Sequence, residues 1–162
     1  MATNIDGGTG IDKVQESAAY QKSNILGTVS ATGTYPNLVP TGAIMESGSN
    51  SNGDYVKYAD GTMICRHSIN LGDITLFGNG TFESPYNGGG VNWQFPINFS
   101  TAPTLSYSAN TTPGSFTSSR CLSINYDTIT STAVNVIRAN RTSSSSSTND
   151  VFAHLTAIGR WK

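Results

Sequence analysis

Strict alternation of apolar and polar residues over positions 151–161 constrains the fold of this chain most strongly. Val151, Ala153, Leu155, Ala157 and Trp161 fall on one side, and Phe152, His154, Thr156, Ile158 and Arg160 on the other. A period of two is the pattern of a β-strand with one buried face, because successive side chains of a strand point to opposite faces. Residues 121–126 repeat the pattern, with Leu122, Ile124 and Tyr126 opposing Cys121, Ser123 and Asn125.

Further short strands are expected between turn-forming residues. We predict strands at 54–58, 63–71, 91–95, 104–110, 120–126, 133–140 and 151–161. Ala59-Asp60-Gly61-Thr62 supplies an Asp-Gly hairpin turn between the first two. No helical period is present after residue 30, so residues 39–162 are predicted to form an all-β domain, an antiparallel β-sandwich.

Residues 1–38 differ from the rest and are predicted to form a separate N-terminal segment. Thr9 and Asp12 resemble a capping box, and an a/d seam follows at Ile11, Val14, Ala18, Gln21 and Ile25. A helix of residues 9–25 is marginal alone, so we expect identical copies of it to be held side by side. The alternative is one amphipathic helix packed on its own domain. The Gly, Thr and Pro residues of 27–36 then indicate an extended linker.

Composition excludes several classes of partner. The chain has 21 Ser, 20 Thr, 15 Asn and 17 Gly among 162 residues, only 12% charged residues and a net charge of −1. Scattered basic residues argue against nucleic acid, which binds mainly Lys and Arg. No apolar stretch approaches the roughly 20 residues of a membrane span. Met1 to Asp6 lack the features of a secretion signal, so we expect the chain to be made and folded in a cytoplasm.

Catalytic and metal-binding motifs were sought and not found. The sequence has no GxSxG, P-loop or HExxH motif, and His67 and His154 lack metal-ligand spacing, so we expect no enzyme, cofactor or metal. Asp54 and Asp60 are a formal carboxylate pair for polysaccharide cleavage, but both occupy ordinary positions for Asp. Cys65 and Cys121 are expected to be reduced and buried, with a disulfide as the alternative.

Candidate ligand-binding residues are aromatic side chains that lie close to neutral hydrogen-bonding side chains. This combination suits a ligand with an apolar face and many hydroxyls. Trp93 and Tyr86 flank the glycine run 88–90, with Asn87 and Asn92 beside them. The full set of candidates is Trp93, Tyr86, Asn87, Asn92, Tyr107, Arg138 and His154. For each of them the alternative is a structural role within a strand.

Four segments carry a resemblance to a known family. Residues 41–65 read TGAIMESGSNSNGDYVKYADGTMIC, preceded by SNILGTVS at 23–30 and followed by FPINFSTAPT at 95–104 and AIGRW at 157–161. In this order they resemble the C-terminal domain of phage and prophage tail fibres. The resemblance implies an H-type-lectin-like β-sandwich, assembled as a homotrimer at a fibre tip on the virion surface, that binds host glycans without catalysis.

The short stretch before the domain favours a short fibre or head spike that docks through residues 1–38 on another virion protein, in a tail, a capsid or a gene-transfer-agent particle. Three functions are then open. The first is recognition of host capsule or lipopolysaccharide by a lectin-like tip. The second is a structural fibre or decoration protein, which predicts that Trp93 and Tyr86 are buried. The third is a depolymerase, which requires Asp54 and Asp60.

Overall fold

The protein is an all-β molecule in every part that the structure describes. A computed structural model describes residues 25–111, 121–142 and 150–162, and these form twelve strands. The strands are β1 (Ala31–Thr32), β2 (Val39–Pro40), β3 (Met45–Asn50), β4 (Gly53–Tyr58), β5 (Thr62–Asp73), β6 (Tyr86–Asn87), β7 (Val91–Gln94), β8 (Thr104–Thr111), β9 (Cys121–Asn125), β10 (Thr128–Ile129), β11 (Ala133–Thr142) and β12 (Asp150–Arg160). The seven strands predicted from the sequence are all present, with ends that differ by one or two residues.

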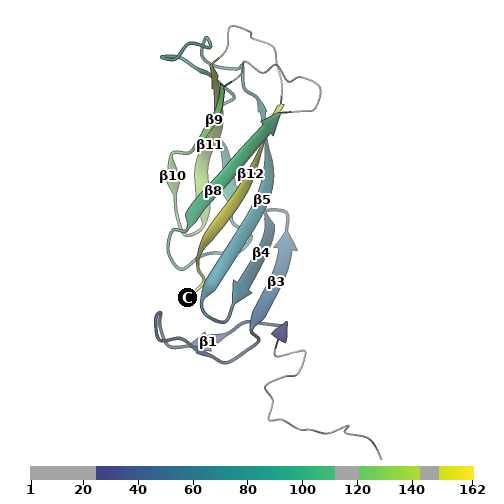
Figure 1. The fold of residues 1–162 in the computed structure, drawn as a ribbon, viewed down its shortest axis with the longest axis vertical. Coiled ribbons are helices and arrows are strands. Elements are labelled where there is room, and N and C mark those ends of the chain that lie inside the picture. The colour runs from purple at the N-terminus through teal and green to yellow at the C-terminus, as the bar shows by residue number, and fades with distance from the viewer. Residues whose placement is uncertain (1–24, 112–120, 143–149) are drawn as a thin grey trace, which may run out of the picture.

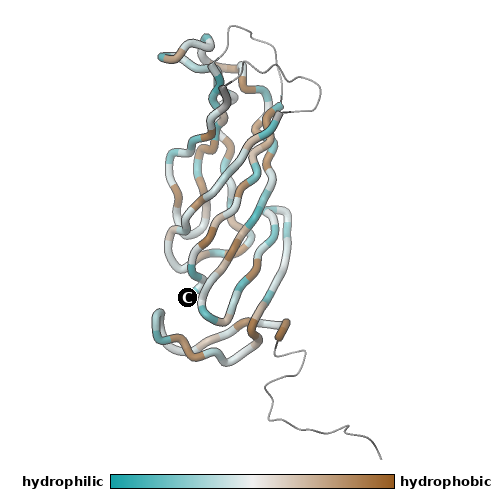
Figure 2. Tube along the Cα trace, viewed as in Figure 1, coloured by the Kyte–Doolittle hydropathy of each residue, from teal (hydrophilic) through white to brown (hydrophobic). Residues whose placement is uncertain are grey.

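The first sheet has five strands in the order β3-β4-β5-β12-β8, all antiparallel (Figure 1). In β12 the residues Val151, Ala153, Leu155 and Ala157 are at most 2% exposed, whereas His154 and Ile158 face solvent. This confirms the predicted alternation. Apolar and polar positions alternate along the strands in Figure 2, and so each sheet buries one face.

The second sheet is built around β11. Its first half pairs with β10 and β7, and its second half pairs with β9 and β6. The register shifts between Val134 and Ile137, and Val136 has a φ of 55°. The Val136 N–H donates to the Oδ1 of Asn92 at 2.8 Å, which stabilises this bulge.

The core lies between the two sheets. Met63 and Leu155 from the first sheet meet Trp93, Val134 and Ile137 from the second. As predicted, Cys65 is a buried free thiol in this core. Burial raises the pKa of the Cys65 thiol to about 12, although a backbone hydrogen bond with Ile97 acts in the opposite direction.

Residues 25–43 pack against one end of the sandwich, which we call the base. Strands β1 and β2 pair there, and Val29, Ala31 and Ala43 are buried. The C-terminal residue Lys162 hydrogen-bonds the Ala31 carbonyl, and the Trp161 indole N–H donates to the Tyr58 carbonyl at 2.8 Å. The segment predicted to be an extended linker therefore packs on the sandwich from about residue 27 onward.

The base and the opposite end, which we call the distal end, lie at the two poles of the elongated molecule. Strand β1 and the C-terminus are at the base, and β9 is at the distal end (Figure 1). The predicted stalk residues Ile11, Val14, Ala18 and Gln21 lie outside the described residues. Ile25, the last of the seam, is described and is 46% exposed.

In the described ranges, no helix is long and apolar enough to cross a membrane. The same ranges contain no group of three or more His, Cys, Asp or Glu side chains that could hold a metal ion.

Candidate functional site

Three strands at the distal end present a continuous polar surface. Asn87 of β6 and Ser123 of β9 both lie opposite Asn140 of the central strand β11. Two pairs further along, Asn125 lies opposite Arg138. Because residues opposite one another in antiparallel strands share a face, these side chains project to the same side. Long-range pairing therefore gathers amides and a hydroxyl from three distant segments.

A depression of about 510 Å³ elsewhere is larger, but the one at this distal surface, about 320 Å³, combines aromatic and amide groups. We call it the distal site. Its lining residues are Phe82, Pro85, Ser123, Asn125, Asn140, Arg141 and Thr142. The Phe82 side chain is 91% exposed, which leaves its ring available to a ligand. An apolar wall thus stands beside a polar floor.

The floor of the distal site is rich in groups that can exchange hydrogen bonds with a ligand. Within the described residues, the side chains of Asn125, Asn140 and Ser123 make no hydrogen bond to the protein. An amide offers two donors and an acceptor, and a hydroxyl offers one donor and accepts as well. The floor can therefore match a ligand that carries several hydroxyls.

Arg141 underlies the distal site. It is 2% exposed, lies opposite Tyr86 in the β6–β11 ladder, and holds its guanidinium 5.5 Å from the centroid of the Tyr86 ring. A cation over an aromatic face is attractive, and the attraction grows when water is excluded. The Arg141–Tyr86 contact therefore fixes β6, and with it Asn87 and Pro85, against the central strand.

Three of the sequence candidates thus surround the distal site. Tyr86 supports it from below, and Arg138 flanks it in an ion pair with Asp127 at 3.3 Å. Asn87 is half-buried; its amide donates to the Pro85 carbonyl at 3.5 Å and its Oδ1 accepts from the Gly89 N–H at 3.4 Å. These contacts make Asn87 a residue that positions the wall of the site.

The prediction that Trp93 is a sugar platform is wrong for this fold. Its side chain is 1% exposed, and its indole N–H donates to the Asn52 carbonyl at 2.8 Å. The ring stands edge-on to Phe95, at 4.9 Å between centroids. Burial and a satisfied donor make Trp93 a core residue.

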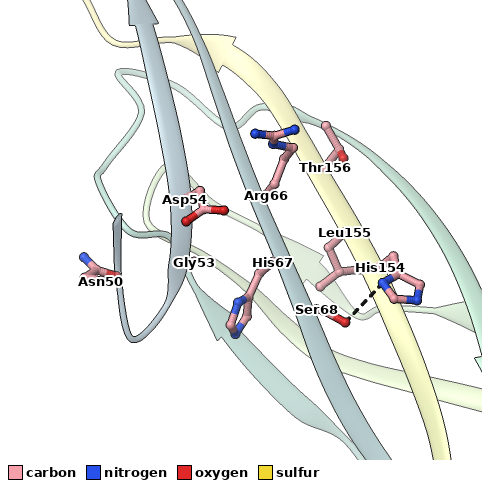
Figure 3. A pocket seen from close by; sticks show the side chains of 9 residues that line it. All are labelled: Asn50, Gly53, Asp54, Arg66, His67, Ser68, His154, Leu155 and Thr156. Carbon is pink, nitrogen blue, oxygen red and sulfur yellow. Dashed lines mark hydrogen bonds between the residues drawn. The ribbon is translucent and has the colours of Figure 1, made fainter. Parts of the chain in front are cut away.

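The other three candidates lie apart from the distal site. Asn92 is committed to the β11 bulge through its bond with Val136. Tyr107 lies on β8, opposite Leu155, and is 46% exposed. His154 lines the larger depression, on the outer face of the first sheet (Figure 3).

Sequence reasoning missed Phe82, Ser123, Asn125 and Asn140. One local signal was available, because Phe82 is an aromatic residue that directly follows the polar, glycine-containing run Gly78-Asn79-Gly80-Thr81. The three polar residues carried no such signal. Their proximity depends on the pairing of β9 with β11, which joins segments about 17 residues apart.

Comparisons with known proteins give a remote likeness. No protein-family model matches the chain, and no curated protein does. One similar structure is a C-terminal fragment of the P. aeruginosa R1 pyocin fibre, with 16% identity, 71% of this chain covered and a TM-score of 0.49. Another is an N-truncated R1-type pyocin tail fibre, with 15% identity, 70% of this chain and 84% of that chain covered, and a TM-score of 0.47. This chain spans 28% of the first fragment. At identities of 15% and 16%, the likeness to these structures says nothing about function.

Proposed function

We propose that this protein is the receptor-binding tip of a fibre or spike on a phage or gene-transfer-agent-like particle. In this role it binds host capsule or lipopolysaccharide through the distal site. The observation that carries the proposal is the 91% exposed ring of Phe82 beside the uncommitted amides of Asn125 and Asn140.

Sugars suit this combination of groups. A pyranose has an apolar C–H face, which packs on an aromatic ring, and hydroxyls that both donate and accept hydrogen bonds. Neutral amides lose water at a smaller cost than charged groups, so they exchange hydration for sugar hydroxyls more readily. Asn125, Asn140, Ser123 and Thr142 are all neutral.

The assignment to a fibre tip rests on the sequence resemblance and on the position of the distal site relative to the end at which the described chain enters. The segments at 41–65, 95–104 and 157–161 resemble tail-fibre C-terminal domains along most of the domain. The described chain enters at the base, and the distal site lies toward the other pole (Figure 1). A protein attached to a particle by residues 1–38 would present the distal site outward.

Trimer formation through the seam at residues 11–25 belongs to the proposal. A shallow sugar site binds near millimolar, about −4 kcal/mol. Three linked sites raise avidity by roughly 10²- to 10⁴-fold without a new contact, provided that all can engage the surface together. Weak single sites are therefore sufficient for attachment to a dense glycan layer.

Catalysis is not part of the proposal. Asp60 is engaged in the hairpin turn, where its Oδ1 accepts from the Thr62 N–H at 2.8 Å. The structural alternative, a decoration protein without glycan recognition, predicts that Trp93 and Tyr86 are both buried. Trp93 is buried, but Tyr86 is only half-buried. This alternative leaves the exposure of Phe82 unexplained.

A pair of matched variants tests the function. Binding of the intact protein to host capsule and lipopolysaccharide is measured on a glycan array and by biolayer interferometry. Phe82→Ala should weaken binding by about tenfold, because loss of an aromatic contact costs roughly 1 kcal/mol or more. Phe77→Ala is the control, since Phe77 is 58% exposed but does not line the site.

Two results would count against the function. Equal binding by Phe82→Ala and the unaltered protein would remove the distal site from recognition. Failure of the intact protein to bind any host glycan, with particle assembly harmed by its deletion, would establish the structural alternative.

A further inference from the structure

The larger depression lies on the outer face of the first sheet and has a different chemistry from the distal site. It has a volume of about 510 Å³ and is formed by the β3–β4 hairpin, β5 and β12. Figure 3 shows the side chains of Asp54, Arg66, Ser68, His154 and Thr156 on neighbouring strands. Register explains the grouping, because Arg66 lies between Asp54 and Thr156, and Ser68 lies opposite His154.

The opposite charges in this depression are not paired with each other. Asp54 and Arg66 are cross-strand neighbours, yet no ion pair within 4.0 Å joins them. In the part of the chain that the structure describes, neither side chain has a hydrogen-bonding partner. Both are exposed, so the guanidinium can be reached from solvent. A guanidinium presents a fork of N–H donors that matches carboxylate and phosphate oxygens.

Both histidines of the chain line this same depression. The His154 Nδ1 and the Ser68 Oγ lie 3.1 Å apart and hydrogen-bond, and the His67 ring stacks on Trp93 with centroids 6.2 Å apart. A guanidinium, two imidazoles and two hydroxyls therefore line the depression, and Asp54 is the one acidic group among the lining residues.

We infer that this depression binds a small oxyanion, a carboxylate or phosphate group. Arg66 supplies the positive charge, and the hydroxyls of Ser68 and Thr156 donate to the remaining oxygens. The His154 ring lies beside the bound anion, and the charge of Asp54 weakens binding. The inference does not depend on the distal site or on its ligand.

The two histidines make the binding directly observable. The ring Cε1–H signals of His67 and His154 are followed by NMR at one fixed pH while glucuronate, inorganic phosphate or glucose is added. Glucuronate or phosphate should shift the His154 signal in a saturable way, because the bound anion lies beside its ring. The tighter of the two anions identifies the class. Glucose should cause no shift.

Two exposed substitutions of opposite sign complete the test. Arg66→Gln should weaken anion binding by about tenfold, the usual scale of one charge-assisted hydrogen bond. Asp54→Asn should strengthen it by about threefold, because a repelling charge is removed. A mere structural disturbance would weaken binding in both. Equal shifts by glucose and glucuronate, or weakening by both substitutions, would overturn the inference.

Discussion

The substitution Glu46→Gln tests how the N-terminal segment is held on the sandwich. The Glu46 carboxylate on β3 accepts from the Val29 N–H at 2.9 Å and from the Tyr55 hydroxyl at 3.0 Å. It also forms an ion pair with the Lys57 ammonium at 3.2 Å. The two charged side chains are only 17% and 13% exposed. One carboxylate therefore joins residue 29 to two strands of the first sheet.

The expected loss of stability follows from these three contacts. A hydrogen bond to a charged group contributes about 1.5–3 kcal/mol, but glutamine retains the shape and one acceptor, so we expect a loss of about 2 kcal/mol at pH 7. For a chain of this length, this corresponds to a fall of about 4–8 °C in the melting temperature. The measurement is urea and thermal unfolding at one fixed protein concentration, because oligomer stability depends on concentration.

The pH dependence of the free energy of unfolding separates the effect of the Glu46 charge from the effect of its shape. Partial burial alone would raise the pKa of Glu46, but the hydrogen bonds from Val29, Lys57 and Tyr55 and the charge of Lys57 outweigh it, so the pKa lies below 4.5. A carboxyl with a lowered pKa stabilises the fold above its unfolded value, and this contribution is lost as pH falls through the folded value. The difference between Glu46→Gln and the unaltered protein should therefore shrink as pH falls below 4.5. A deficit that is equal at pH 7 and pH 3 would refute this reasoning.

Two further predictions concern the core. Trp93→Phe should lower the free energy of unfolding in urea by about 2–3 kcal/mol, because it leaves a cavity and removes the donor to the Asn52 carbonyl. Glycan binding should stay unchanged. A loss of binding without a loss of stability would contradict the core assignment. Cys65 should resist a thiol-specific reagent at pH 8 in a Cys121→Ser variant and should react after unfolding, because burial raises its pKa to about 12; rapid reaction in the folded protein would show that the core opens readily.

The strands were largely predictable from the sequence because their burial is one-sided. In β12 the alternate residues Val151, Ala153, Leu155 and Ala157 are buried, so periodicity alone located the strand and its inner face. Strand β3 was missed, because Ser47-Gly48-Ser49-Asn50 has the composition of a loop and lies at the edge of the sheet. An edge strand needs few apolar residues, and its pairing with β4 supplies the order that its sequence does not show.

The candidate site was less predictable because its residues meet only through long-range pairing. Local composition identified Asn87 and Tyr86, which the structure places beside the distal site. It also selected Trp93, because an aromatic residue near a glycine run looks the same whether the opposite sheet covers it or not. The depression around Arg66 and His154 joins residues 88 positions apart, and only the β5–β12 register reveals it.

The β5–β12 ladder has a mechanical consequence for the proposed role. Eleven residue pairs run along these two strands, and β8 adds eight more on the other side of β12. If the particle pulls at the base while a cell surface holds the distal end, the load acts along the strands. Many hydrogen bonds then share the force together instead of breaking one by one. A tethered tip of this design should withstand drag that would unzip a sheet pulled sideways.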